Sequence, residues 1–336
     1  MFKFKIMRQK QLNRSGLQGL ALAKRRFALS VMIPIVIYMA FWTIIPYLWV
    51  ILLSFFEYSP RRVGGAFLGL GGDNPFVGLT HFKAMLDFSE GAPRYVTQFR
   101  QAFKNTFIFA AIVVPLNLMI TIPLAVLVNE IRKRSLSTLF RTVFFTPVIT
   151  SSVGVGLMWT YIFNPQRGIL NHVLSSISGS RVSISWLHDA NLTFLGIPSS
   201  LFAVLIAYLW MDVGYNFVIF LAGLQNIPDS VKEAAIVDGA SPLQRFFKVT
   251  LPLLQPQVLL TSILTMISGF QIFDLVKVMT DGGPNNMSRV IVLEIFDGAF
   301  RYQRMGWSSA VSLVFFLVVL IISLIQKKVI RQDWEY

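Results

Sequence analysis

The side chains best placed to do chemistry are polar residues inside otherwise apolar stretches of the sequence. One set recurs at offsets of 0, 4, 7 and 8 residues, which places its members on one face of a helix. A second set has two members three residues apart. Polar groups inside an apolar helix are costly, so they are candidates for a binding site or a pathway. The candidates are Tyr208, Asp212, Tyr215 and Asn216 in the first set, and Gln271 and Asp274 in the second.

Two interpretations of these residues stay open. Carboxylates and amides bind hydroxyl groups and aromatic faces cover C–H surfaces, so the two faces could line a pathway for a carbohydrate. Alternatively, the polar groups bond to neighbouring helices and hold a bundle together, and for Asp212 and Asn216 the sequence does not separate these roles. For Asp274 a structural role is favoured, because it could pair with Lys277 three residues later.

Bond-breaking chemistry finds little support in the sequence. The chain has no Cys, which excludes thiolate catalysis and Cys-ligated metals. Its three histidines, His81, His172 and His188, lack metal-ligand spacing, and neither an H-E-x-x-H nor a G-x-S-x-G motif occurs. No G-x-x-x-x-G-K-[ST] loop is present to bind the phosphates of ATP. We therefore expect no catalytic residue, no metal site and no cofactor on this chain, and a membrane-embedded enzyme is disfavoured.

The composition of the chain indicates that the elements carrying these residues are membrane-spanning helices. Of the 336 residues, 54% are hydrophobic and 14% are charged, whereas an ordinary soluble domain has about 25% charged residues. Apolar runs long enough to cross a bilayer recur along the chain, which excludes a soluble globular protein. Six transmembrane helices are predicted, at Phe27–Phe56, Thr106–Val128, Val143–Phe163, Pro198–Leu221, Pro252–Val278 and Ser308–Ile325.

The basic residues predict the orientation of these spans. The net charge of +14 comes from short clusters between apolar runs, a pattern that orients membrane proteins and argues against nucleic acid as a partner. Arg132, Lys133, Arg134 and Arg141 fall within ten residues. We therefore expect an all-α, multi-pass protein with both termini in the cytoplasm. Its expected parts are a basic arm (1–26), a transmembrane domain (27–326) with an outer loop (57–104) that contains a short amphipathic helix near His81–Phe88, and a tail (327–336).

The inner connection over residues 229–251 contains two helix-start signals. Ser230 and Glu233 have the spacing of a capping box, and Gly239 supplies a helix stop. Ser241 and Pro242 then fit an N-cap followed by a proline in the first helical position. The sequence thus predicts a helix–turn–helix elbow that projects into the cytoplasm.

Two aromatic residues in the second half of this elbow, Phe246 and Phe247, suggest a protein partner. The alternative is a well-capped but solvated linker. A motif that spans the elbow resembles the EAA motif of permease subunits in binding-protein-dependent ABC importers: Glu233-Ala234-Ala235-Ile236-Val237-Asp238-Gly239-Ala240, continued by Val249-Thr250-Leu251-Pro252.

Other stretches are similar to the carbohydrate-importer branch of that family, and within it to the maltose-type first permease. The resemblance covers roughly residues 30–325 and includes Phe76–Phe82, Asn105-Thr106, Phe140–Pro147, Gly168–Asn171, Leu221–Pro228 and Met279–Pro284. It implies the type I ABC importer permease fold, in the cytoplasmic (inner) membrane of a prokaryote.

The resemblance also implies partners. The elbow would dock on cytoplasmic ABC ATPase subunits, two per transporter, which would carry the ATP and Mg²⁺. An extracytoplasmic solute-binding protein would deliver the solute, and a second, homologous permease would complete the pore within the membrane lipid. The residues expected to couple to the ATPase are Glu233, Ala234, Ala235, Asp238, Gly239, Ala240, Phe246, Leu251 and Pro252.

Two alternatives to a sugar importer remain. A permease for a polyol or glycerol phosphate would look similar in sequence. A secondary sugar transporter would need no docking elbow and would more often show repeated halves or broken helices, neither of which is evident in the sequence.

Overall fold

The computed structural model describes residues 22–62 and 69–329, and these are mostly helical. The first helix runs over Leu22–Leu53 and contains a π-helical turn, η1 (Ala40–Ile44), followed by α2 (Ile45–Leu53). The next elements are α3 (Thr80–Met85), α4 (Arg94–Asn129), α5 (Arg134–Phe145), η2 (Thr146–Ile149), α6 (Ser152–Ile162), α7 (Ile169–Ser178), a hairpin of β1 (Thr193–Phe194) and β2 (Ile197–Pro198), and α8 (Ser199–Gln225). After these come α9 (Asp229–Val237), α10 (Pro242–Arg245), η3 (Phe246–Thr250), α11 (Leu251–Leu253), α12 (Gln255–Phe270), α13 (Asp274–Met279), α14 (Ile291–Phe296), η4 (Asp297–Arg301) and α15 (Met305–Val329).

Four described helices are each long and apolar enough to cross a membrane: Leu22–Leu53, α4, α8 and α15. Two further candidates are bent pairs, so the number reaches the predicted six when each pair counts as one span. In the first pair, the helix formed by α5 and η2 is followed by α6 with a bend of 102°. In the second pair, the helix that runs from α10 through α11 is followed by α12 with a bend of 69°. Bent helix pairs, which were not evident in the sequence, are therefore present in the described chain.

Both bends have local causes in the backbone. Thr150 and Ser151, which separate η2 from α6, have ψ angles of 137° and 134°, and these extended conformations end one helix before the next begins. At the second bend Leu254 has a ψ of 2°, and Pro256 follows in the first turn of α12 without an N–H to donate. The predicted fifth span also ends early, because α12 stops at Phe270 and α13 begins separately.

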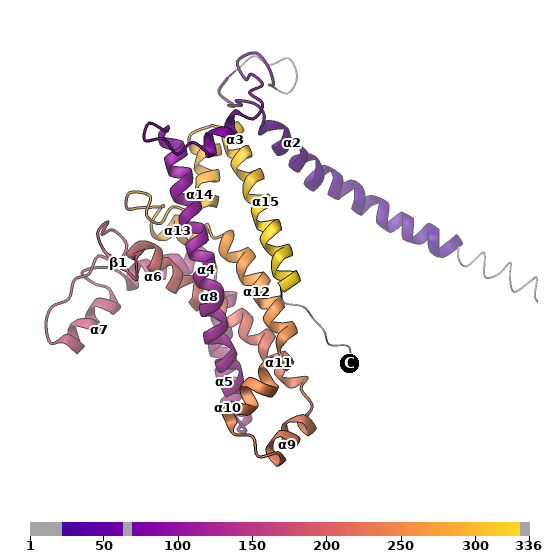
Figure 1. Ribbon diagram of the computed structural model, residues 1–336, viewed down its shortest axis with the longest axis vertical. Coiled ribbons are helices and arrows are strands. Elements are labelled where there is room, and N and C mark those ends of the chain that lie inside the picture. Colours follow the sequence, from indigo (N-terminus) through magenta and orange to yellow (C-terminus); the bar gives the residue numbers. More distant parts are fainter. Residues whose placement is uncertain (1–21, 63–68, 330–336) are drawn as a thin grey trace, which may run out of the picture.

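The centre of the molecule is a bundle in which α4 packs along α8 and α12 (Figure 1). Its apolar interior includes Phe109, Phe217 and Phe220, each at most 1% exposed. Close approach of α5 to α8 depends on Gly214, since a Cβ there would collide with the Phe144 carbonyl oxygen. Polar side chains inside α4 and α8 are therefore held at fixed positions relative to one another.

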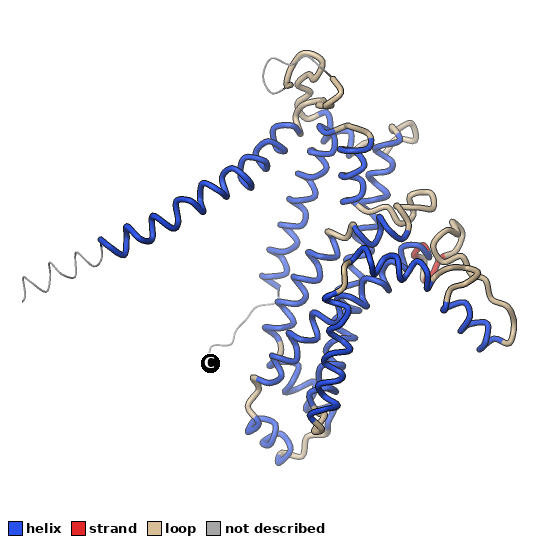
Figure 2. The backbone as a smooth tube through the Cα atoms, turned by 180° about the vertical axis from the view of Figure 1, so that it is seen from behind, coloured by secondary structure: helices blue, strands red, loops and turns tan. Residues whose placement is uncertain are grey.

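The first helix extends away from this bundle, as Figures 1 and 2 both show. Its C-terminal part, α2, contacts α15, and the most apolar stretch of the first helix is not buried by the other described residues. An apolar helix exposed on all sides suits contact with lipid.

The two ends of the bundle differ. The elbow of α9 and α10 lies at the bottom in Figure 1, and α3 and α14 lie at the opposite end. Helix α3 confirms the short helix predicted near His81–Phe88. The predicted loop 57–104 is partly helical, because α4 begins at Arg94, about three turns before the apolar run starts.

Candidate solute pathway and coupling elbow

A cleft of about 390 Å³ opens where the break between η2 and α6 faces α8 and the connection from α12 to α13. The structure brings the two predicted polar sets together there, although they lie on different helices. Five of the six predicted pathway residues line it: Tyr208, Asp212, Tyr215, Gln271 and Asp274. The other lining residues are Val148, Ser152, Met211, Ser268, Ile272, Phe273 and Leu275.

Asp212 lies at the centre of a hydrogen-bond network that joins three helices. Its Oδ2 accepts from Asn117 Nδ2 on α4 at 2.8 Å, from Thr265 Oγ1 on α12 at 2.8 Å and from Asn216 Nδ2 at 3.1 Å. The side-chain Oδ1 of Asn117 in turn accepts from Asn216 Nδ2 at 2.9 Å and from Thr121 Oγ1 at 3.0 Å. Three donors to one carboxylate oxygen compensate the cost of placing Asp212 inside the bundle.

Asn216 does not line the cleft. Its side chain is 0% exposed, and its Nδ2 also lies 2.7 Å from Thr265 Oγ1. For Asn216 the geometry therefore favours the bundle-holding interpretation, whereas Asp212 takes part in both the network and the cleft wall. Sequence reasoning missed Asn117 and Thr265, although an Asn in the middle of an apolar span with Thr121 four residues later was a detectable signal.

Asp274 is held in a different way from the one predicted. Its Oδ2 accepts a hydrogen bond from Ser152 Oγ at 2.6 Å, which ties α13 to α6 across the cleft. The expected pair with Lys277 was wrong, because the Lys277 ammonium lies 2.6 Å from Asp281 and 3.7 Å from Asp297 instead. Asp274 therefore remains available at the cleft surface.

The elbow forms a turn between two helices, but its first cap differs from the prediction. Helix α9 begins at Asp229 with Pro228 as its N-cap and has no side-chain cap, so the predicted capping box of Ser230 with Glu233 was wrong. Asp229 instead places a carboxylate in the first turn, where the helix dipole favours it, and it pairs with Lys232 at 3.0 Å.

The turn itself has the geometry of a Schellman motif. The Ala240 N–H donates to the Ala235 carbonyl and the Gly239 N–H to the Ile236 carbonyl, both at 3.0 Å. Gly239 has a φ of +75°, a left-handed conformation that favours glycine. This confirms the predicted helix stop.

The second helix of the elbow starts at Ser241, as predicted. Its Oγ accepts from Gln244 N at 3.3 Å, and Gln244 Oε1 accepts from Ser241 N at 2.8 Å, so the capping box lies here. Sequence analysis predicted the N-cap and the following Pro242 but not the role of Gln244.

The elbow presents apolar side chains to its surroundings. Val237 is 86% exposed and Leu243 is 72% exposed, and the half-buried Phe246 packs against a core cluster of the bundle together with Leu251. The predicted coupling residues accordingly divide into three groups. Glu233, Ala234, Asp238 and Gly239 are exposed, Ala240, Phe246, Leu251 and Pro252 are half-buried, and Ala235 is buried.

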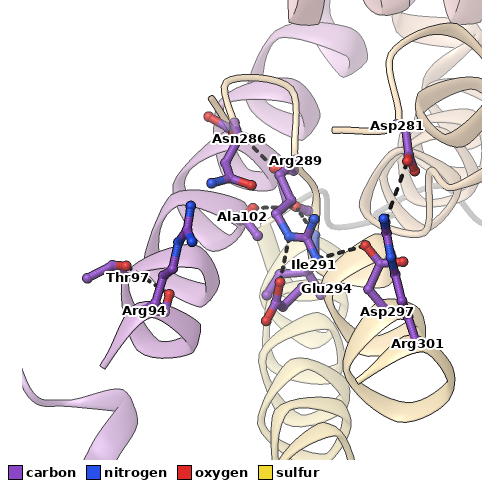
Figure 3. Close-up of polar contacts among 12 residues, drawn as sticks. Arg94, Thr97, Ala102, Asp281, Asn286, Arg289, Ile291, Glu294, Asp297 and Arg301 are labelled. Atoms are coloured by element: carbon purple, nitrogen blue, oxygen red, sulfur yellow. Dashed lines mark hydrogen bonds and ion pairs between the residues drawn. The ribbon is translucent and has the colours of Figure 1, made fainter. Parts of the chain in front are cut away.

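A buried ion cluster joins Arg289 to α14 and η4 (Figure 3), and α14 lies at the end of the bundle opposite the elbow (Figure 1). The Arg289 guanidinium donates to Glu294 through Nε at 2.6 Å and to Asp297 through Nη2 at 2.9 Å. Burial opposes the charge on Arg289, but these carboxylates outweigh that effect and raise the pKa of the guanidinium. Burial raises the pKa of the Glu294 carboxyl, although Arg289 opposes the shift.

Helix α4 fixes the segment that contains Arg289. Asn105 Nδ2 lies within 3.1 Å of the carbonyl oxygens of Asn286, Met287 and Arg289, and the Ile291 N–H donates to Thr106 Oγ1 at 2.9 Å. Sequence analysis noted Asn105 and Thr106 only as part of a resemblance and gave them no role. The cluster and its supports position α14 beside the helix that also supplies Asn117 to the Asp212 network.

Comparison with known proteins gives the context for this arrangement. Residues 117–332 match the model of the family described as "Binding-protein-dependent transport system inner membrane component". The probable ABC transporter permease protein YurN of Bacillus subtilis (strain 168) is 29% identical over 304 residues, which are 90% of this chain and 96% of that protein. The probable ABC transporter permease protein YesP of the same organism is 35% identical over 253 residues, 74% of this chain and 76% of that protein.

A third relative and a solved structure add to these. The sn-glycerol-3-phosphate transport system permease protein UgpA of Yersinia enterocolitica is 28% identical over 267 residues, 79% of this chain and 84% of that protein. A chain of a bacterial alginate ABC transporter, solved in complex with an alginate pentasaccharide-bound periplasmic protein, has the same fold, with a TM-score of 0.74 at 21% identity over 92% of this chain and 95% of that chain. The chain therefore belongs to the family of inner membrane components of binding-protein-dependent transport systems.

Proposed function

We propose that this chain is a permease subunit of an ATP-driven importer, through which a carbohydrate passes from an external solute-binding protein across the inner membrane of a prokaryote. Both termini lie in the cytoplasm in this proposal. The chain has no ATPase site of its own, so ATP and Mg²⁺ are bound by two ATPase subunits.

The observation that carries the proposal is the elbow. Two short helices are locked at a defined angle by a Schellman turn and a capping box, and they present exposed Val237 and Leu243 at one end of the bundle. A linker that only connects two spans needs neither this rigidity nor exposed apolar groups. A rigid apolar projection suits a groove on the ATPase, because little conformational entropy is lost on docking.

The cleft supports the carbohydrate part of the proposal. Tyr208 and Tyr215 supply aromatic faces, and Gln271 and the two carboxylates supply hydrogen-bonding groups for hydroxyls. The cleft is open to the surroundings rather than enclosed, and a second permease subunit packed over it would close the pathway.

A permease for glycerol phosphate is the second candidate. It is favoured by the similarity to UgpA, whose name states that solute. Against it, the cleft residues include two carboxylates and, among the described residues that line it, no Lys, Arg or His to bind a phosphate.

Cross-linking from the elbow tests the coupling role. Cys placed at Val237 or Leu243 should form a cross-link to the ATPase subunit in the assembled complex, since this chain has no other Cys. Cys at Leu195, which is 97% exposed on the β1–β2 hairpin, is the matched control and should not cross-link to the ATPase. Equal cross-linking from Leu195, or none from both elbow positions, would contradict the assignment.

A further inference from the structure

The charges around the cleft are of one sign. Asp212 and Asp274 both line it, and they come from α8 and from the first residue of α13. Among the described residues of the lining, none is a Lys, Arg or His. The cation nearest in sequence, Lys277, is engaged by Asp281 and Asp297 rather than by Asp274.

The two carboxylates are held by neutral donors. Asp212 Oδ2 receives hydrogen bonds from two amides and a hydroxyl, and Asp274 Oδ2 receives one from the Ser152 hydroxyl. Hydroxyl and amide donors orient a carboxylate without bringing a positive charge that would neutralise it. The field of both groups therefore extends into the cleft, where low-dielectric walls strengthen it.

The cleft also contains a polar group with unused bonding capacity. The Tyr208 hydroxyl is buried beside the Ser268 hydroxyl and the Asp212 carboxylate, and it forms no hydrogen bond of standard geometry with either. It lines the cleft beside Asp212. A hydroxyl-bearing solute in the cleft would offer this group a hydrogen bond of better geometry.

We infer that this cleft is an acidic passage that admits neutral and cationic carbohydrates, such as amino sugars, and excludes anionic ones. The inference rests on the proposed function, because it takes the cleft to be the pathway of the transporter. A uronate or a sugar phosphate would bring its negative charge towards two fixed carboxylates without a cation in the lining to compensate. The ammonium group of an amino sugar and the hydroxyl groups of a neutral sugar would instead donate hydrogen bonds to these carboxylates.

The potential in the cleft can be measured independently of transport. Cys placed at Ser268 or Gln271, both exposed in the cleft, is modified in the membrane-embedded complex with two methanethiosulfonates of similar size, one bearing a trimethylammonium and one a sulfonate. Modification is read from the mass of this chain, which has no other Cys. Both reagents need the thiolate, so the ratio of their rates, relative to a free thiol, reports the local potential alone.

We expect the cationic reagent to be favoured by about tenfold at one or both positions. Asp274→Asn and Asp212→Asn should each lower the ratio by about threefold, whereas Asp73→Asn, on the exposed loop after the first helix, should leave it unchanged. Any of four results would overturn the inference: a ratio near one, a preference for the sulfonate reagent, a ratio that neither Asn variant changes, or no modification at either position. Failure of the proposed function would appear instead as solute uptake without ATP, which this labelling does not measure.

Discussion

Replacing Arg289 with Met should destabilise the protein by about 3–5 kcal/mol, because the change removes the cation between two buried carboxylates. Arg289 is 4% exposed, Glu294 is 2% exposed and Asp297 is 0% exposed, so water cannot replace the lost partner. Thermal unfolding of the purified complex, followed through the chain's tryptophans, should show the loss. Uptake should fall in parallel, since Arg289 no longer holds Glu294 of α14 and Asp297 of η4 together.

The destabilisation should depend on pH. Burial already raises the pKa of Glu294, and loss of the opposing Arg289 charge raises it further. A carboxyl with a raised pKa in the folded state favours folding at low pH, and this contribution is lost as the pH rises through that value. The Arg289→Met protein should therefore be least stable at high pH and recover as the pH falls.

Two further variants test the assignment of this effect to the ion cluster. Arg301→Met removes an exposed cation 3.7 Å from Asp281 and should cost at most about 1 kcal/mol. Adding Glu294→Gln and Asp297→Asn to Arg289→Met removes the buried charges that have lost Arg289 and should restore much of the stability. Equal losses for Arg289→Met and Arg301→Met would show that the cluster does not stabilise the fold.

Replacing Gly239 with Val should reduce solute-stimulated ATPase activity in the assembled complex by about tenfold. Gly239 has a φ of +75°, where a β-branched side chain costs roughly 1–2 kcal/mol or more. Nothing lies within 4 Å of a Cβ at this position, so the cost arises from backbone conformation rather than from a clash. An elbow that loses this turn no longer presents α9 and α10 at one fixed angle.

Gly179 supplies a matched control for this prediction. It caps α7 with a φ of +67° and also has no atom within 4 Å of a Cβ, but it lies far from the elbow in sequence. Gly179→Val should keep ATPase stimulation near the parent value, and Gly239→Asn should retain most of it because Asn tolerates the left-handed conformation. Equal losses in both Val variants would indicate a general folding defect rather than a coupling defect.

The sequence predicted the elbow well because its signals are local. Gly239 acts through its left-handed backbone, Ser241 through a side-chain bond to Gln244 three residues later, and Pro242 through its fixed φ at the first helical position, and the structure has all three as expected. The predicted capping box at Ser230 was wrong for a local reason too, since the N-cap is Pro228, with a ψ of 137°, and the helix starts two residues earlier than predicted.

The cleft was only partly predictable, because periodicity identifies the polar face of a helix but not its neighbours. Tyr208, Asp212 and Tyr215 were identified by their spacing, and all three line the cleft. Asn216 has the same spacing, yet it is bonded to α4 and α12 through Asn117 and Thr265, which are 99 and 49 residues away. The Asp274–Lys277 pair failed for the same reason, since Ser152 comes from a helix 122 residues earlier.

The breaks in the third and fifth spans were the largest omission. Hydropathy sums apolar residues over a window and does not register a bend, so Val143–Phe163 appeared as one span although η2 and α6 meet at 102°. Thr150 and Ser151, at the break, are polar but not unusual in a membrane helix. The bend matters for function because it places Val148 and Ser152 beside α8 as a wall of the cleft.

The claim that an elbow on this chain couples a solute pathway to ATP hydrolysis is tested most directly by uptake into vesicles. The complex with its ATPase subunits is reconstituted, the binding protein and labelled solute are supplied outside, and the lumen contains ATP, a non-hydrolysable analogue or no nucleotide. Uptake should occur with ATP alone and should be lost when the ATPase subunits are left out. Uptake that continues without ATP or without the ATPase would contradict the account.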